Sequence, residues 1–204
     1  MRMWQWSTAM RSSDDMLANP QRRALLGAAL LAWVCPSLGA QQWLKQPDIP
    51  DLHLIDQDGK AWHLYEDLIR GRIVVVNFIF AGCITVCPPQ TALLRALREQ
   101  LDQRSHEVLL LSLTVDPLND RPQQLREFAR RYDIPLGLAH GWLMLTGSMR
   151  NMERALAAFD ADSPSPEAHP ALLWLGNEPR QRWTRASSLN PPQTLLRLID
   201  EVQA

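Results

Sequence analysis

Two cysteines four residues apart are the side chains best suited to chemistry in this chain of 204 residues. Cys83 and Cys87 follow the β-branched and aromatic run 73–80, and a helical pattern of leucines begins soon after them. They therefore lie at a strand-to-helix corner, the kind of edge at which open α/β sheets bind ligands. Backbone N–H groups and the helix dipole at such a corner favour the thiolate, the form that binds metal ions and attacks disulfides. A plain disulfide or two buried thiols are the alternatives.

Alternating strand and helix patterns surround this corner and predict an α/β fold, with a central sheet covered by helices on both faces. Leu52 and Leu64 flank the turn residues Asp58-Gly59, which predicts an N-terminal β-hairpin. The spacing of four places both thiols on one side of a first helical turn. Further strands are expected at 73–80, 108–115, 171–175 and 181–185, with helices that begin at the N-cap Asp120, at Ser148 and at Pro191 or Pro192.

The first 40 residues have the pattern of an export signal. Arg22-Arg23 precede the apolar run 24–34, and Pro36 and small residues follow it. A membrane span needs about 20 apolar residues, so this run is short for one. We expect an export signal or an N-terminal anchor over 1–40, of the twin-arginine class, and a linker over 41–51. The mature domain is then periplasmic, either free or anchored to the inner membrane.

The composition excludes some classes of protein and of partner. The chain has 46% hydrophobic and 21% charged residues, which excludes a disordered protein. Lys and Arg number 21 against 22 Asp and Glu, so no basic field indicates a nucleic-acid partner. Of three cysteines, Cys35 falls in the export signal, and the pair Cys83 and Cys87 remains in the mature domain.

The order of motifs from Leu52 to Val202 resembles the Sco/SenC family of thioredoxin-fold copper proteins. The matching motifs are Asp58-Gly59, Val74-Val75-Val76-Asn77-Phe78, Cys83-Ile-Thr-Val-Cys87-Pro88, Asp116-Pro117, Asp120-Arg-Pro122, Leu145-Thr-Gly147 and His169. The resemblance implies a thioredoxin-like domain over 52–204, with a central mixed sheet and with Cys83, Cys87 and His169 as metal ligands. Two soft thiolates suit Cu(I), and the imidazole also allows Cu(II). Structural zinc normally takes a fourth protein ligand.

This resemblance implies a copper metallochaperone for cytochrome c oxidase assembly. Such a protein takes copper from a donor protein, passes it to a copper-accepting oxidase subunit, and turns over no substrate. The alternative is a thiol-disulfide oxidoreductase that reduces the cysteines of the oxidase copper site; it needs the redox pair Cys83 and Cys87 but not His169. A redox or copper sensor is a third hypothesis. Whether the protein is an enzyme stays open, with the metallochaperone favoured.

Two residues depart from the family pattern. Ile84 stands where the family commonly has Pro, and Pro170 stands where it commonly has Ser or Thr. Pro170 near the thiols favours the oxidoreductase, whereas the Cys-x-x-x-Cys loop is one residue longer than the usual redox loop. Asp116 is expected to serve as a turn or cap acceptor.

Overall fold

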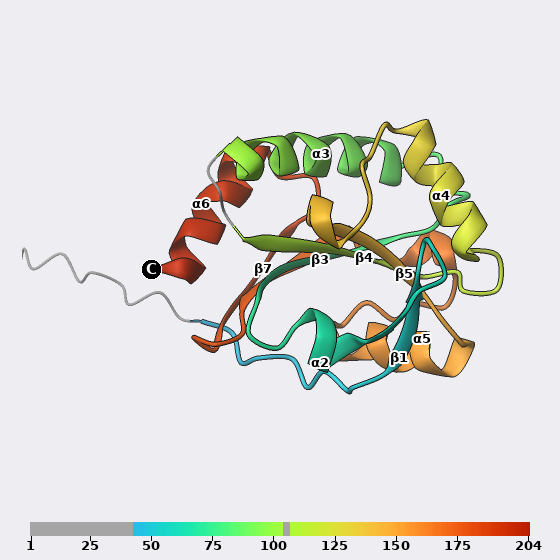
Figure 1. Cartoon of the computed structure of the whole chain (residues 1–204), viewed down its shortest axis with the longest axis horizontal. Helices are drawn as coiled ribbons and strands as arrows, with labels where there is room; N and C mark the ends of the chain where they lie inside the picture. The colour runs from blue at the N-terminus through green and yellow to red at the C-terminus, as the bar shows by residue number, and fades with distance from the viewer. Residues whose placement is uncertain (1–42, 104–106) are drawn as a thin grey trace, which may run out of the picture. The chain divides into compact units, whose positions relative to one another are not determined.

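The computed structural model describes residues 43–103 and 107–204, which form a seven-stranded mixed sheet with the order β2-β1-β5-β4-β3-β6-β7 (Figure 1). The central strands β3, β4 and β5 are parallel, and the outer strands are antiparallel to their neighbours. The strands are β1 (His53–Asp56), β2 (Ala61–His63), β3 (Ile73–Ile79), β4 (Val108–Thr114), β5 (Trp142–Thr146), β6 (Leu172–Asn177) and β7 (Arg182–Ser187). The sheet confirms the predicted α/β class.

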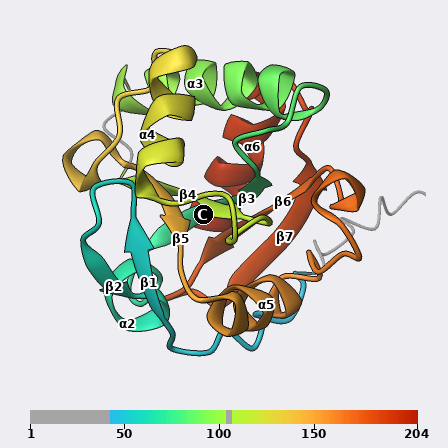
Figure 2. The ribbon, with the colours of Figure 1, turned by 90° about the vertical axis from the view of Figure 1, so that its right-hand side faces the viewer.

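Helices cover both faces of the sheet (Figures 1 and 2). The helices are α2 (Leu64–Leu68), α3 (Cys87–Gln103), α4 (Pro122–Arg131), α5 (Met149–Ala158) and α6 (Pro192–Gln203), with short 3-10 turns η2 (Leu138–His140) and η3 (Pro166–Ala168). On one face lie α3, α4 and α6, and on the other lie α2 and α5 (Figure 1). No helix among the described residues is both long enough and apolar enough to cross a bilayer.

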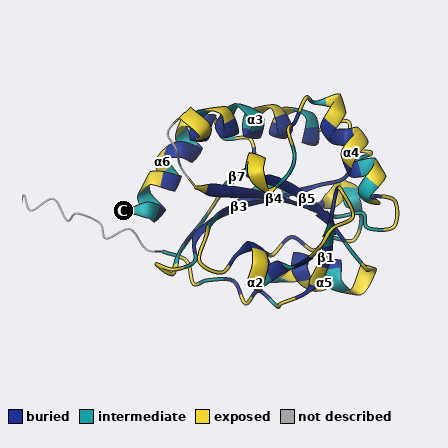
Figure 3. Cartoon of the chain, viewed as in Figure 1, coloured by how far each residue is buried: buried dark blue, intermediate teal, exposed yellow. Residues whose placement is uncertain are grey.

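The two faces of the central strands feed two separate apolar cores. Successive side chains of a strand point to opposite faces, so Val74 and Val76 pack with α2 and α5 whereas Val75 packs with α3 and α6. Both β3 and β4 are buried along almost their whole length (Figure 3). A strand buried on both faces has few polar side chains, which explains the continuous apolar run in the sequence.

The predicted hairpin is present and extends the sheet, because β1 also pairs with β5. Leu54 lies opposite Trp62. Asp56 organises the turn: its carboxylate accepts hydrogen bonds from the amides of Asp58 and Lys60 and from the Trp62 indole, 2.8–3.0 Å away. Gly59 completes the turn at φ +79°, a conformation that favours glycine.

Part of the N-terminal prediction, the export signal or anchor over 1–40, lies outside the described residues. From the predicted linker 41–51, Leu44 donates its amide to the Trp183 carbonyl at 2.8 Å, and Ile49 is buried in the core that α2 and α5 cover. At the other helices, Ser148 caps α5 as predicted by accepting the Asn151 amide.

Candidate metal and redox site

The two thiols lie where β3 ends and α3 begins. The Cys83 amide donates to the Phe80 carbonyl at 3.1 Å, which turns the chain away from the sheet. The helix starts at Cys87, so Cys83 precedes it, and the prediction that both cysteines share a first helical turn is wrong. Pro88 and Pro89 follow inside the first turn, where a missing N–H costs nothing.

Instead, Cys83 takes the place of a helix cap. Its sulfur lies 3.3 Å from the amide nitrogen of Cys87 and accepts that hydrogen bond. The first amides of a helix have no partner within the helix, and an acceptor side chain that precedes them satisfies one. Thr85 places its hydroxyl 3.9 Å from the same sulfur. The loop thus directs donors at Cys83, and both cysteines are free thiols.

These contacts make the two thiols chemically unequal. Burial raises the pKa of Cys83, but hydrogen bonds from Cys87 and Thr85 outweigh burial and hold that pKa below its usual value. Burial raises the pKa of Cys87 to about 12, and the hydrogen bond to Cys83 adds to the rise. Cys83 is therefore the readily ionised, nucleophilic member of the pair, and Cys87 is its protonated neighbour.

Asp120 fastens this loop to the next strand. The prediction that Asp120 caps α4 is wrong: Arg121 occupies the N-cap without a side-chain bond. The Asp120 carboxylate, only 2% exposed, accepts the Ala81 amide at 3.0 Å and the Thr114 hydroxyl at 2.5 Å. The Ala81 amide lies just past the end of β3, so the carboxylate supplies an acceptor where the ladder has stopped.

Asp120 is thus a site residue that sequence reasoning assigned to the wrong task. Its only signal was its place in the Asp120-Arg-Pro122 motif, after the strand that ends at Asp116-Pro117. Burial raises its pKa against the hydrogen bonds from Thr114 and Ala81, which lower it. The neighbouring Asp116 keeps the predicted turn role, because its carboxylate accepts the Asn119 side-chain amide at 2.9 Å.

His169 ends the η3 turn and precedes β6. The residue is 7% exposed, and its ring meets the Phe80 ring edge-on, with centroids 6.1 Å apart. Nδ1 lies 3.3 Å from the Pro170 carbonyl oxygen, which can only accept, so the proton is placed on Nδ1. Nε2 is buried and has no hydrogen-bond partner. Burial lowers the pKa of His169, so its free nitrogen carries a lone pair at neutral pH.

Phe80 belongs to the same buried apolar cluster as both cysteines, and its ring meets the His169 ring edge-on. The structure brings Cys83 and Cys87 into contact. Within residues 43–103 and 107–204, however, no three His, Cys, Asp or Glu side chains are close enough together to hold one metal ion. The three-residue ligand set therefore remains a prediction. It requires His169 and the thiols to come closer together.

The other histidines among the described residues take no part in this site. His140 is exposed at the end of η2, and His106 lies outside the described residues. His53 and His63 lie on the hairpin strands β1 and β2. The thiol corner and His169 are therefore the groups to compare with known proteins.

Comparisons with known proteins identify the family to which this chain belongs. A SCO1 protein homolog of Bacillus subtilis is 33% identical over 156 residues, which is 74% of this chain and 77% of that protein. The solved structure of BsSco, described as a member of the Sco family of cytochrome c oxidase assembly proteins with a disulfide switch, is 28% identical. It superposes with a TM-score of 0.66 over 79% of this chain and 95% of that one.

A copper-bound structure of Arabidopsis thaliana ScoI has the same fold, with a TM-score of 0.60 and 20% identity over 74% of this chain and 96% of that one. The mixed sheet with its thiol corner is thus the thioredoxin-like fold that was expected. The family model described as SCO1/SenC matches residues 43–200, nearly all of the described chain. This protein therefore belongs to the SCO1/SenC family.

Proposed function

We propose that this protein is a metallochaperone that binds copper through Cys83, Cys87 and His169 and delivers it to a subunit of cytochrome c oxidase. One observation carries the proposal: the two unequal thiols share a buried cluster with Phe80, and the Phe80 ring contacts a neutral imidazole that has a free, buried nitrogen. A buried polar atom without a partner is rare and calls for an explanation. A metal ion that binds Nε2 would provide one.

The donor set suits copper as cargo. Thiolates select Cu(I), and an imidazole extends the site to Cu(II). Cys83 offers the thiolate first, because its pKa is already lowered. Cys87 must release its proton to solvent as the metal binds, so copper competes with a proton at that sulfur. Because the pKa of Cys87 is raised, its sulfur readily takes up a proton again when copper leaves.

Relatives support the copper cargo and the oxidase target. Copper is bound in the Arabidopsis thaliana ScoI structure, and BsSco is described as belonging to a family of oxidase assembly proteins. By extension we propose a copper donor protein and a copper-accepting oxidase subunit as partners. We further propose export to the periplasm through the signal over 1–40, by the twin-arginine route. The domain is then either released or left anchored to the inner membrane.

The binding test measures copper on the reduced full-length chain. With Cu(I) we expect about one copper per chain, held against a competing chelator, with strong loss in Cys83→Ser and in Cys87→Ser. His169→Ala should weaken Cu(II) more than Cu(I), because two thiolates remain for the softer ion. Cys35→Ser and His140→Ala are the matched controls and should bind as the parent does. Unchanged Cu(II) binding by His169→Ala would contradict the assignment.

A thiol-disulfide oxidoreductase is the second candidate, favoured by the unequal thiols. An attacking cysteine of low pKa beside a buried partner is the arrangement that disulfide exchange uses. To separate the two functions, copper transfer to an apo oxidase fragment is measured beside reduction of a disulfide in that fragment. A metallochaperone loses transfer in His169→Ala. An oxidoreductase keeps full reduction in His169→Ala and loses it in Cys83→Ser.

A further inference from the structure

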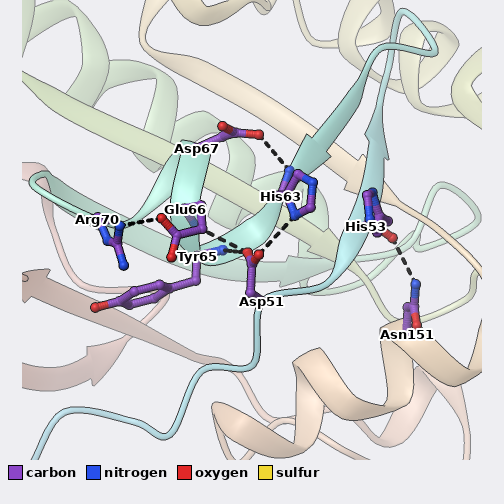
Figure 4. Close-up of polar contacts among 8 residues, drawn as sticks. All are labelled: Asp51, His53, His63, Tyr65, Glu66, Asp67, Arg70 and Asn151. Carbon is purple, nitrogen blue, oxygen red and sulfur yellow. Dashed lines mark hydrogen bonds and ion pairs between the residues drawn. The ribbon is translucent and has the colours of Figure 1, made fainter.

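We propose that the outer face of the β1–β2 hairpin is a second metal site, in which His53 and His63 bind a late transition-metal ion, preferentially Cu(II). The residues of this face are drawn in Figure 4. They lie on β1, on β2, on α2 and the turn after it, on α5, and on the segment just before β1. The proposal does not depend on the proposed function of Cys83, Cys87 and His169.

The strand register places the two imidazoles opposite one another. His53 pairs with His63 in the antiparallel ladder of β1 and β2. Hydrogen bonds join the Asp56 amide to the Lys60 carbonyl and the Leu64 amide to the Leu52 carbonyl. Because bonded and non-bonded pairs alternate, His53 and His63 form a non-hydrogen-bonded pair, in which side chains approach more closely. Their ring centroids are 4.0 Å apart, at an interplanar angle of 55°.

Asp51 orients His63 for metal binding. Its Oδ2 lies 2.9 Å from Nδ1 of His63, and a carboxylate can only accept, so the proton is on Nδ1. Nε2 is then left with a free lone pair, and 45% of the side chain is exposed to solvent. A carboxylate that holds the second nitrogen of a histidine is the usual outer partner of a metal-binding imidazole.

The carboxylate that holds His63 is itself fixed. The other Asp51 oxygen accepts the amides of Tyr65 and Glu66, at 3.1 and 3.2 Å, in the first turn of α2 (Figure 4). An anchored carboxylate fixes the tautomer and the orientation of the imidazole that it contacts.

The backbone on both sides of the pair is also held. The Asn151 side chain on α5 donates to the His53 carbonyl at 2.9 Å, and the His63 amide donates to the Asp67 carboxylate at 2.8 Å (Figure 4). Both strands are therefore tied to neighbouring elements before a metal arrives. Fixing the ligand positions in advance lowers the entropy cost of binding an ion.

The ligand types decide the class of ion. The pair supplies two imidazoles, and no third His, Cys, Asp or Glu in the described part of the chain is close enough to join them. Water must therefore fill the other positions. Imidazole nitrogen suits copper, nickel and zinc and does not suit Mg²⁺ or Ca²⁺, which take oxygen ligands. Affinity for divalent ions peaks at Cu²⁺. Without a thiolate, this site favours Cu(II) over Cu(I).

The test isolates the hairpin from the proposed copper site. In the full-length chain, Cys83→Ser, Cys87→Ser and His169→Ala together remove every proposed ligand of that site. Calorimetry with Cu(II) should still show one bound ion, and the electron paramagnetic resonance spectrum should show coupling to imidazole nitrogen. Circular dichroism checks that the triple variant keeps the parent fold. A triple variant that binds no Cu(II) would overturn the proposal.

Single substitutions in that background assign the ligands. His53→Gln and His63→Gln should each weaken Cu(II) binding at least tenfold, since the chelate falls to one imidazole. Asp51→Asn should weaken it by about tenfold, at the low end of the range for lost outer partners. His140→Gln changes an exposed histidine elsewhere and should leave the affinity unchanged. Equal affinity for His53→Gln and the background, or equal losses in His53→Gln and His140→Gln, would overturn the assignment. A failure here leaves the Cys83, Cys87 and His169 proposal untouched.

Discussion

The thiol corner and the hairpin face present metal-binding side chains in opposite surroundings. Cys83, Cys87 and His169 are buried, whereas His53 and His63 lie on an outer strand face. Burial makes each protonation state depend on a few hydrogen bonds, and it separates the pKa values of two identical thiols. On the hairpin, a single carboxylate orients one ring, and water reaches the rest. The buried site is therefore suited to selective, proton-coupled binding, and the exposed site to weak binding of a ligand that exchanges freely.

The largest expected effect separates the two sites by ligand chemistry. Cys83→Ser should lower Cu(I) affinity by more than the roughly 10–100-fold that loss of an outer partner costs, because a directly binding thiolate is removed. His63→Gln should leave Cu(I) affinity unchanged. Competition with a Cu(I)-specific chelator measures both, with Cys35→Ser as the control. A similar Cu(I) loss in the two variants would mean that the sites are not separate.

The next effect concerns the support of the buried site. Asp120→Ala leaves the Ala81 amide and the Thr114 hydroxyl without their acceptor, and we expect a loss of about 1–3 kcal/mol in the free energy of unfolding. Asp120→Asn keeps one acceptor oxygen and should lose less. Urea unfolding measures the change. Asp162→Ala, at an exposed position, should stay within about 0.5 kcal/mol of the parent. An Asp120→Ala chain as stable as this control would show that the carboxylate does not secure the loop.

The pH dependence should reveal the inequality of the thiols. Cys83 has a pKa lowered from 9.0, so its contribution to stability is present above about pH 9 and is lost as pH falls through its folded pKa. Cys87 has a pKa raised to about 12, so its contribution is present below about pH 9 and is lost as pH rises toward 12. Carbon chemical shifts of labelled cysteine, in a Cys35→Ser chain, should therefore show two well-separated titrations. Two coincident titrations near pH 9 would refute the asymmetry.

His169 should make the free energy of unfolding depend on pH in the acidic range as well. Burial lowers its pKa below 6.5, so the unfolded chain binds a proton there before the folded chain does. Stability should fall as pH drops below about 6.5. His169→Gln should flatten that part of the curve of unfolding free energy against pH. The exposed His140→Gln should leave the curve unchanged, and a His169→Gln curve identical to that of the parent would contradict burial as the cause.

The smallest effect belongs to the exposed hairpin. Asp51 accepts two amides in the first turn of α2, so Asp51→Ala should cost about 0.5–2 kcal/mol, as loss of a helix cap does. Asp48→Ala, three residues earlier and also exposed, serves as the control. Thermal unfolding without metal measures both. Equal transition temperatures for the two variants would mean that Asp51 does not hold the hairpin and α2 together.

Periodic patterns made most of the fold predictable. The run Ile73–Ile79 could only be a buried strand, and the Asp58-Gly59 turn marked the hairpin, because both signals come from neighbours in the chain. The first residue of α3 was harder to predict, because proline is tolerated in the first turn of a helix and does not mark the residue at which the helix begins. Contact between the thiols followed from a spacing of four residues, but through a capping hydrogen bond and not along one helical turn.

Contacts between residues far apart in the sequence could not be predicted from such local patterns. Asp120 was predicted to cap its own helix, yet it binds Ala81, 39 residues away. His53 and His63 were not selected as a site, although the hairpin was expected, because the register that pairs them depends on where the turn closes.

The sequence by itself determined the α/β class, the thiol pair and the hairpin, because each depends on residues that are close together in the chain. Only the tertiary structure decided which thiol ionises, that Phe80 shares a buried cluster with the thiols and contacts His169, and that Asp120 supports the loop. The physical reason is the parallel pairing of β3 with β4. It brings two distant strand ends to one edge, where burial and a few hydrogen bonds set the chemistry.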